Sequence, residues 1–349
     1  MIKKESFSEE HIRNLQKASK RDPALLERAV YALGLLEAIT RMEMPFVFKG
    51  GTCLMLLLRH PQRLSTDIDI IVKPGTDVEE YIEKAAEIFP FVKYEEQTRI
   101  GKNQIEKRHF KFTYISPINR KEFYILLDVL YEENNYTSII QKEIVNDLIL
   151  TEPEFLKVNI PSIECILGDK LTAFAPHTTG IPLNVGKDME IMKQLYDVAT
   201  LLEEYNDFDS VRDTYMKVVQ SEIAYRGKDI TWKDCLLDTL QAAKCIVSRG
   251  KSSSDDYQLY VQGIRDLRGH IYTENYSPEI AVGRAAKVAY MVVCLLVDSP
   301  YKKVENYRDY ADKMFINQDM IIFKYLKKAN PEAYAYMIKM DRMMESVNK

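Results

Sequence analysis

The pattern of apolar residues changes once along the chain, and this change constrains the fold more than any other feature of the sequence. Between Phe46 and Tyr131, short apolar runs alternate with turn residues, which is typical of β-strands. After Pro161 no convincing strand is indicated, and apolar residues recur at helical spacing through the remaining sequence. The sequence therefore predicts a sheet in the first half of the chain and helices in the second.

The predicted elements can be assigned to residue ranges. Two helices are expected within residues 8–43, the second running from Pro23 to Arg41. The predicted strands are Phe46–Phe48, Asp67–Val72, Phe91–Tyr94, His109–Ile115 and Phe123–Tyr131, with a helix at Val78–Ile88. Further helices are predicted at residues 162–175, 188–205, 209–225, 232–249, 255–269, 278–297 and 302–346, the last interrupted. We expect an α+β fold, with a mixed sheet and flanking helices in residues 1–155 and an all-helical domain in residues 156–349.

Length, charge and cysteine content limit the class of protein. A chain of 349 residues is longer than a single hydrophobic core usually supports, so two domains are expected. A net charge of −4 excludes a uniformly positive surface, so nucleic-acid binding would need a local basic patch. Five cysteines without paired spacing favour reduced thiols. The start of the sequence has no signal-peptide pattern, and the apolar run Val288–Val297 is about half the ~20 residues of a membrane span. We expect a cytoplasmic protein without membrane contact.

A glycine turn follows the first predicted strand. Gly50, Gly51 and Thr52 stand between this strand and a helical segment that starts at Cys53. Backbone N–H groups at such a turn and helix start can bind a phosphate group. A double glycine is also compatible with a plain tight turn, because glycine relieves steric limits wherever it occurs.

An Asp-x-Asp pair lies on the next predicted strand. Asp67 and Asp69 are two residues apart, so both side chains share one face, and Ile68 lies on the other. Two carboxylates about 7 Å apart repel each other, and a divalent cation such as Mg²⁺ relieves this repulsion. A polar strand end facing water is the alternative. Ser65 shares the face of the pair and could contact metal or phosphate, or cap its own turn.

A third carboxylate, Asp128, is the only charge in the apolar strand FYILLDVLY. We expect this strand to be buried on both faces. A buried carboxylate costs several kcal/mol unless it is paired or bound to a metal. Asp128 is therefore predicted as a third metal ligand, with hydrogen bonding to backbone or tyrosine as the alternative.

These residues resemble a known family. The sequence is similar to the AbiEii/AbiGii toxin-type nucleotidyltransferases of the DNA polymerase beta superfamily, which are toxins of bacterial toxin–antitoxin systems. The resemblance rests on Gly50-Gly51-Thr52, Arg63-Leu64-Ser65-Thr66-Asp67-Ile68-Asp69, Gly168-Asp169-Lys170-Leu171-Thr172-Ala173 and Lys193-Gln194-Leu195-Tyr196-Asp197-Val198. It covers about residues 45–205. The family commonly has Arg-Asp where this chain has Lys193-Gln194, so either Asp197 or Asp188 would have to supply the carboxylate.

The resemblance implies a nucleotidyltransferase-like sheet and transfer of a nucleotide from a nucleoside triphosphate to an acceptor, either a tRNA 3′ end or a protein. In this hypothesis Asp67 and Asp69 hold Mg²⁺, and Asp128 binds a second ion and helps to deprotonate the acceptor hydroxyl. Gly50 to Thr52, with Ser65, would bind the β- and γ-phosphates. A cognate antitoxin protein is an implied partner.

The resemblance adds two residues from the second half. Lys170 lies within the apolar stripe of its predicted helix, where contact with a triphosphate would explain its presence; a lysine that snorkels from the helix edge is the alternative. Asp197 is predicted as catalytic from the family match alone. The alternative is an exposed i,i+4 ion pair with Lys193.

The stretch from Lys93 to Lys121 is basic, with eight Lys or Arg and three Glu. It also contains Tyr94, His109, Phe110, Phe112 and Tyr114. A positive hairpin with aromatic residues could bind RNA, and an edge hairpin protected by charge is the other interpretation.

Three functions remain open at this point. The first is a nucleotidyltransferase toxin acting on tRNA, another RNA or protein. The second is a transferase that modifies a small molecule such as an antibiotic, which a neutral or acidic site rim would favour. The third is a catalytically silent relative that binds RNA or a partner protein; the presence of Asp67, Asp69 and Asp128 together argues against it.

Overall fold

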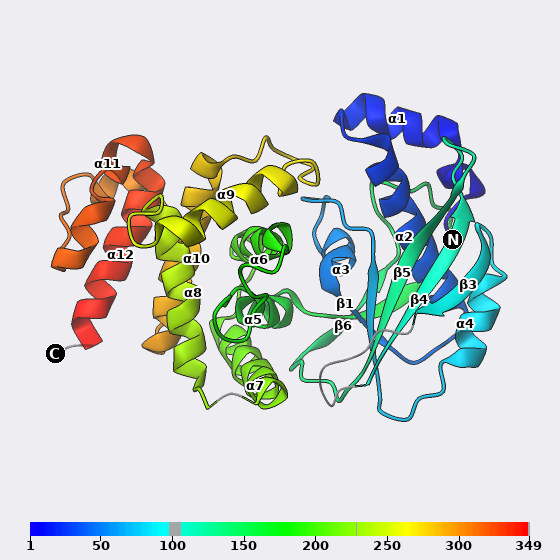
Figure 1. Cartoon of the computed structure of the whole chain (residues 1–349), viewed down its shortest axis with the longest axis horizontal. Helices are drawn as coiled ribbons and strands as arrows, with labels where there is room; N and C mark the ends of the chain where they lie inside the picture. The colour runs from blue at the N-terminus through cyan, green and yellow to red at the C-terminus, as the bar shows by residue number, and fades with distance from the viewer. Residues whose placement is uncertain (98–105, 228, 348–349) are drawn as a thin grey trace. The chain divides into compact units, whose positions relative to one another are not determined.

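The computed structural model describes residues 1–97, 106–227 and 229–347. These residues form two compact units. The first unit is Met1–Ser162 with Gly269–Glu274, and the second is Ile163–Arg268 with Asn275–Lys349. The predicted α+β class is confirmed, since a mixed sheet lies in the first unit and helices make up the second (Figure 1).

The first unit contains all the predicted strands and helices of the N-terminal half. In chain order it consists of a 3₁₀ helix η1 (Lys4–Phe7), α1 (Glu9–Ser19), α2 (Pro23–Arg41), β1 (Val47–Lys49), α3 (Gly50–Leu57), β2 (Ile68–Val72), α4 (Glu79–Ala86), β3 (Phe91–Gln97), β4 (Lys107–Ile115), β5 (Glu122–Tyr131), β6 (Ile139–Glu143) and β7 (Lys157–Pro161). The sequence did not reveal β6 and β7, which pair antiparallel as a separate two-stranded sheet. Because β7 belongs to this unit, the unit continues past residue 155 to Ser162.

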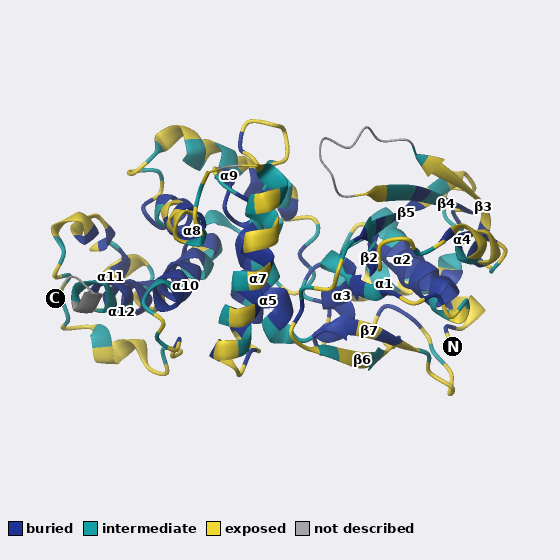
Figure 2. Ribbon diagram, turned by 90° about the horizontal axis from the view of Figure 1, so that it is seen from below, coloured by how far each residue is buried: buried dark blue, intermediate teal, exposed yellow. Residues whose placement is uncertain are grey.

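The main sheet has the strand order β1-β2-β5-β4-β3. Only the β2–β5 pair is parallel, and the other neighbours run antiparallel. Helix α2 packs on β2 and β5, and α4 packs on β3. In Figure 2 α2 is almost entirely buried, whereas β3 and β6 are largely exposed. The core of the unit therefore lies between α2 and one face of the sheet.

Helix α2 is anchored to the β4–β5 turn by one aromatic contact and one polar contact. Tyr31 stacks on Tyr114 of β4 with 3.8 Å between ring centroids. The Ser116 hydroxyl donates a hydrogen bond of 2.9 Å to Oε2 of Glu27, which is 2% exposed. Burial raises the pKa of Glu27, and the hydrogen bond from Ser116 opposes this. Glu27 thus holds α2 on the sheet, although burying its carboxyl group costs solvation free energy.

Residues 269–274 follow the helix α9 (Ser254–Leu267) in the sequence but belong to the first unit. The Leu64 N–H donates to the His270 carbonyl at 2.7 Å, and the Tyr272 N–H donates to the Gln62 carbonyl at 2.8 Å. These two bonds form a short antiparallel bridge between Arg63 and Ile271. The segment leading into β2 is therefore held by residues far away in the sequence.

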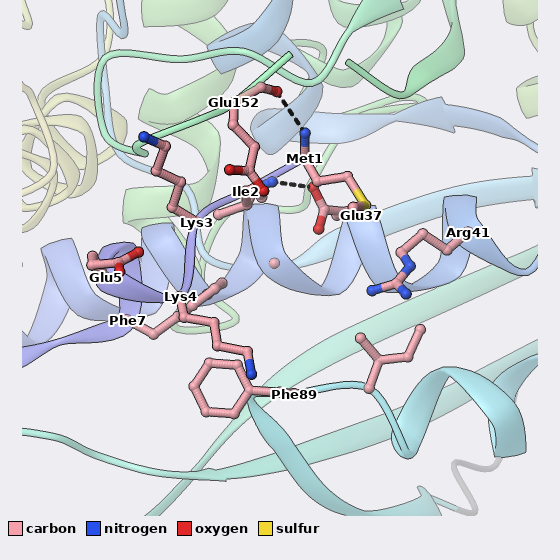
Figure 3. Close-up of a pocket in the computed structure, with 12 residues that line it drawn as sticks. Met1, Ile2, Lys3, Lys4, Glu5, Phe7, Glu37, Arg41, Phe89 and Glu152 are labelled. Carbon is pink, nitrogen blue, oxygen red and sulfur yellow. Dashed lines mark hydrogen bonds between the residues drawn. The ribbon is translucent and has the colours of Figure 1, made fainter. Parts of the chain in front are cut away.

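A cavity of about 490 Å³ lies between the N-terminal segment, α2 and Phe89 (Figure 3). Along its wall the Ile2 N–H donates to Glu37 Oε2 at 2.6 Å, and the Met1 nitrogen donates to the Glu152 carbonyl at 2.8 Å. None of the residues predicted to form the site lines this cavity.

The second unit confirms the helices predicted for the C-terminal half. It contains α5 (Ile163–Ala173), α6 (Asp188–Leu201), α7 (Phe208–Arg226), α8 (Trp232–Val247), α9 (Ser254–Leu267), α10 (Pro278–Leu296), the 3₁₀ helices η2 (Tyr307–Tyr310) and η3 (Gln318–Phe323), α11 (Leu326–Ala329) and α12 (Pro331–Val347). Across the described residues of both units, no helix combines the length and the apolar character needed to cross a membrane.

The raised pKa of Glu27 predicts how stability depends on pH. The unfolded chain releases this proton at a lower pH than the folded chain, so the folded state loses stability as pH rises above the unfolded value of about 4.3. We expect Glu27→Gln, which keeps an oxygen acceptor for Ser116, to increase the free energy of unfolding at pH 7 and to lose this advantage below about pH 4. Urea unfolding at both pH values measures the difference. The exposed Glu10→Gln is the control, and a smaller free energy of unfolding for Glu27→Gln at pH 7 would contradict the prediction.

Candidate active site

A row of polar residues crosses the main sheet. Lys49 pairs with Asp69, Asp69 with Asp128, Asp128 with His109, and His109 with Gln97. Residues directly opposite each other on neighbouring strands project from the same face of a sheet. All five residues are partly exposed. The register thus brings one polar residue from each strand into a single row, which we call the polar row.

The alternate positions on these strands are apolar and buried. Exposure is 1% or less for six of them: Phe48, Ile68, Ile70, Phe110, Leu127 and Val129. Alternation along each strand separates these residues from the polar row. The chain therefore buries one face of the sheet and leaves the carboxylates on the other.

Asp128 departs from the prediction that its strand is buried on both faces. Its side chain is 25% exposed, and only alternate residues of β5 are buried. The carboxylate is also not alone, because Nδ1 of His109 lies 2.6 Å from its Oδ1. The expectation was wrong because apolar neighbours along a strand do not show which face is covered. Sequence reasoning placed His109 in the basic hairpin and missed this contact, which depends on strand register.

Asp69 lies against the start of α3. A Cβ added to Gly50 would fall 2.0 Å from Oδ2 of Asp69, and the backbone of Gly50 has φ of +80°. A Cβ at Gly51 would fall 2.6 Å from the Ser65 hydroxyl and 2.7 Å from a guanidinium nitrogen of Arg63. The glycines are therefore required because side chains of the following segment occupy the space of a Cβ. The predicted residues Gly50, Gly51, Ser65 and Asp69 do come together at this point.

Thr52 connects α3 to the segment before β2. Its hydroxyl donates a hydrogen bond of 2.6 Å to the carbonyl of Asp67, and the residue is fully buried. This hydroxyl is committed to the backbone, so any contact of Thr52 with a ligand would come from its N–H group. The residue positions Asp67.

Asp67 immediately precedes β2, and its side chain is 45% exposed. Nη2 of Arg28, on α2, lies 3.8 Å from Oδ1 of Asp67. The neighbours Ile68 and Ile70 are buried while Asp67 and Asp69 are partly exposed, which confirms the predicted alternation. An ion pair this exposed adds little stability, and the Asp67 side chain stays nearly half exposed beside Arg28.

No group of three or more His, Cys, Asp or Glu side chains within the described ranges is arranged to hold a metal ion. The donor chemistry nonetheless fits Mg²⁺. Asp69 and Asp128 are direct neighbours across a parallel strand pair. Magnesium is commonly held by one or two carboxylates together with substrate phosphates and water, and not by a complete protein cage.

The second unit contains a buried ion pair. Nζ of Lys170, on α5, lies 3.0 Å from Oδ2 of Asp197, on α6, and the side chains are 11% and 2% exposed. The same Nζ donates to Oε1 of Gln194 at 3.1 Å. The alternative of an exposed ion pair at Asp197 is wrong, because the Asp197 side chain is buried and contacts Lys170 of α5. Nζ of Lys193 lies 3.9 Å from Oε1 of Glu190.

Asp188, the other candidate carboxylate, begins α6. Burial raises its pKa, with smaller contributions from the negative charges of Asp266 and Glu190. Lys170 contacts Asp197 and Gln194. Gln194 thus stands where the family commonly has an aspartate and still contacts the lysine through its amide oxygen.

The basic hairpin is largely neutralised in its described part. Lys93 pairs with Glu122 at 2.8 Å, and Arg108 pairs with Glu96 at 2.8 Å. The aromatic residues Phe110, Phe112 and Tyr114 are buried in the core and cannot stack on bases. Two of the basic residues, at positions 99 and 102, lie outside the described residues. The hairpin therefore fits an edge protected by charge better than an RNA-binding surface.

Comparisons with known proteins identify the kind of protein that the chain resembles. A family model described as "Nucleotidyl transferase AbiEii toxin, Type IV TA system" matches residues 35–269. No curated protein matches the chain. Two crystal structures from Helicobacter pylori share 16% identity with it at a TM-score of 0.44, and each covers 77% of this chain. One is JHP933, of which 92% is covered, and the other is a candidate nucleotidyltransferase, of which 95% is covered.

The close approach of Asp69 to Gly50 predicts a strong effect of a single methyl group. Gly50→Ala must accept a positive φ, which costs about 1–2 kcal/mol, and must also displace the Asp69 carboxylate. Gly75 is a matched control, because its φ is +82° and nothing lies within 4 Å of an added Cβ. We expect Gly75→Ala to show the backbone cost alone and Gly50→Ala a larger loss of stability in urea unfolding. Equal losses of stability in the two variants would contradict the close contact between Gly50 and the Asp69 carboxylate.

The Lys170–Asp197 pair predicts a second stability effect. Asp197→Asn leaves Lys170 buried without its counter-charge, which typically costs about 3–5 kcal/mol. We expect the double variant Lys170→Met/Asp197→Leu to recover most of this loss, because neither charge remains. Glu190→Gln, in the exposed pair on the same helix, should change the free energy of unfolding by less than about 1 kcal/mol. A loss of similar size in Glu190→Gln and Asp197→Asn would refute the assignment.

Proposed function

The chain belongs to the family of AbiEii nucleotidyltransferase toxins, and from this premise we propose that its polar row carries out nucleotide transfer to a hydroxyl acceptor. Family membership makes the chain a nucleotidyltransferase and implies a nucleoside triphosphate as substrate. The observation that best supports the row as the site is the pairing of Asp69 with Asp128, beside the glycine start of α3.

The three carboxylates are proposed to act as metal ligands. Asp67 and Asp69 would hold one Mg²⁺, and Asp128 would contribute to a second. When bound, divalent cations neutralise phosphate charge and stabilise the attacking and leaving oxygens. The partial exposure of all three side chains supports this proposal, since each is open to a ligand.

Asp128 is proposed to accept the proton that the acceptor hydroxyl loses during the reaction. The acceptor hydroxyl oxygen bonds to the α-phosphorus, the bond from that phosphorus to the bridging oxygen breaks, and pyrophosphate leaves. Asp128 accepts the hydroxyl proton on Oδ2, because Oδ1 is in contact with His109. With its Nδ1 protonated, His109 donates to Oδ1 and holds the carboxylate in a fixed orientation.

Phosphate binding is proposed for the glycine turn and for Lys170. The N–H groups of Gly50 to Thr52 belong to the first turn of α3 and have no partner within that helix, which favours an anion. Ser65 adds a hydroxyl next to Gly51. In the second unit, Lys170 is proposed to bind phosphate, and its contact with Asp197 holds the ammonium group in place.

We propose a tRNA 3′ end as the first acceptor to test and protein as the second. The family description supports a toxin role with a cognate antitoxin as partner. A cytoplasmic location is part of the same proposal. A small-molecule acceptor is the alternative to these two. The neutralised hairpin favours it, because Lys93 and Arg108 are already paired with glutamates.

Substitution of the carboxylates tests the proposed chemistry. We expect Asp67→Asn and Asp69→Asn each to reduce the transfer rate at least about 100-fold, because stabilisation of charge in the transition state is lost. The assay uses Mg²⁺, each α-labelled nucleoside triphosphate in turn, and total bacterial tRNA, total protein or an aminoglycoside as acceptor. Asp147→Asn, an exposed carboxylate of the same unit, should retain full activity.

The outcomes separate the proposals. Label on RNA, on protein or on the small molecule identifies the acceptor class. Undiminished transfer by both Asp67→Asn and Asp69→Asn would show that the site lies elsewhere, provided that circular dichroism shows folded proteins. If expression of the wild type arrests bacterial growth and expression of Asp69→Asn does not, the toxin role is supported.

A further inference from the structure

A second cavity, of about 530 Å³, lies in the helical unit. It is bounded by the end of α10, by η2 and by the second half of α12, and α10 and α12 pack side by side (Figure 1). Tyr290, Ser299 and Tyr310 contribute polar groups to its wall. The cavity lies beyond residues 35–269, which the family model matches, so the family assignment says nothing about it.

Three cations line this cavity: Lys313, Lys339 and Arg342. No Asp or Glu belongs to the lining. In the described part of the chain, none of the three cations has a carboxylate oxygen within 4.0 Å. Positive charge is thus concentrated on the wall of this cavity, and no carboxylate belongs to its lining.

The two lysines rest on aromatic rings. Nζ of Lys313 lies 4.6 Å from the ring centroid of Tyr310, and Nζ of Lys339 lies 4.8 Å from that of Tyr290. Cation–π contacts hold an ammonium group in place but leave its net charge uncompensated. Desolvation by burial lowers the pKa of Lys339, and the nearby positive charge of Lys302 acts in the same direction, while Cys294 and Glu305 oppose it. An anion bound in the cavity would offset the free-energy cost of burying the charged ammonium group of Lys339.

The end of α10 does not account for the three cations. Cations often gather at helix C-termini to satisfy exposed carbonyls. Here the Val297 N–H already donates to the Val293 carbonyl at 3.1 Å, and the Ser299 N–H donates to the Cys294 carbonyl at 2.9 Å. Nζ of Lys339 donates to the Lys302 carbonyl, which lies outside that helix.

We propose that this cavity binds a phosphate group carried by a nucleotide or a polynucleotide. Arg342 offers a planar fork for two phosphate oxygens, and Lys313 and Lys339 supply point charges. The hydroxyl of Ser299, which also lines the cavity, can donate a further hydrogen bond. Binding here does not require the carboxylates of the polar row.

Calorimetry with the full chain tests the proposal, with inorganic phosphate, AMP and total tRNA as probes. We expect Arg342→Gln and Lys339→Gln/Arg342→Gln to weaken binding about tenfold or more. The matched control is Lys327→Gln/Lys328→Gln, which removes two exposed lysines from α11 and should leave the affinity unchanged. Arg342 is exposed, so the single variant should fold even if the double variant does not.

A position-specific measurement accompanies the affinities. Bound probe should protect Lys313 and Lys339 from acetylation by acetic anhydride, as measured by mass spectrometry, but should not protect Lys327. Tighter binding of AMP than of inorganic phosphate identifies a nucleotide site, and selective loss of tRNA binding in Arg342→Gln identifies a polynucleotide site. The proposal is overturned if no probe binds, or if cavity and control variants bind equally. Asp69→Asn should bind as the wild type does at this cavity, so failure of nucleotide transfer would leave this result intact.

Discussion

The parallel pairing of β2 with β5 sets Asp69 beside Asp128, and the rest of the site depends on this juxtaposition. Like charges opposite each other on neighbouring strands destabilise a sheet. Here Lys49 and His109 stand at either side of the two carboxylates, and the opposite face of the same strands is apolar and covered by α2. The fold thus buries one face to gain stability and keeps on the other a concentration of negative charge that a bound cation would relieve.

The local elements were predictable because each one has its own signal. Pro23 marks the start of α2, and the buried Ile68 and Ile70 alternate with the partly exposed Asp67 and Asp69. The register was not predictable, because β5 joins β2 from a distant part of the sequence. The contact of His109 with Asp128 was missed for that reason, although both residues are visible in the sequence. Strands β6 and β7 were missed because β6 is mostly exposed and lacks an apolar alternation.

One wrong expectation and one wrong alternative have a common physical cause. Asp128, surrounded by apolar residues in sequence, was expected to be buried and is one-quarter exposed. For Asp197 the alternative interpretation was an exposed ion pair with Lys193, whereas its side chain is almost fully buried against Lys170. Sequence neighbours report the polarity of a segment, whereas burial is decided by the element packed against each face. In the helical unit, α6 contacts α5, α9 and α10, so little of its surface is left for solvent.

The bridge between Arg63 and Ile271 has a consequence for the order in which the protein can mature. The segment that leads to Asp67 and Asp69 receives the partner of this bridge from residues 269–274, which follow α5 to α9 in the chain. Domains made during translation generally fold from the N-terminus onward. The carboxylate-bearing unit is an exception, since its last piece leaves the ribosome after five helices of the other unit. A chain terminated before residue 269 would therefore carry Asp67, Asp69 and Asp128 without the backbone bridge at Arg63.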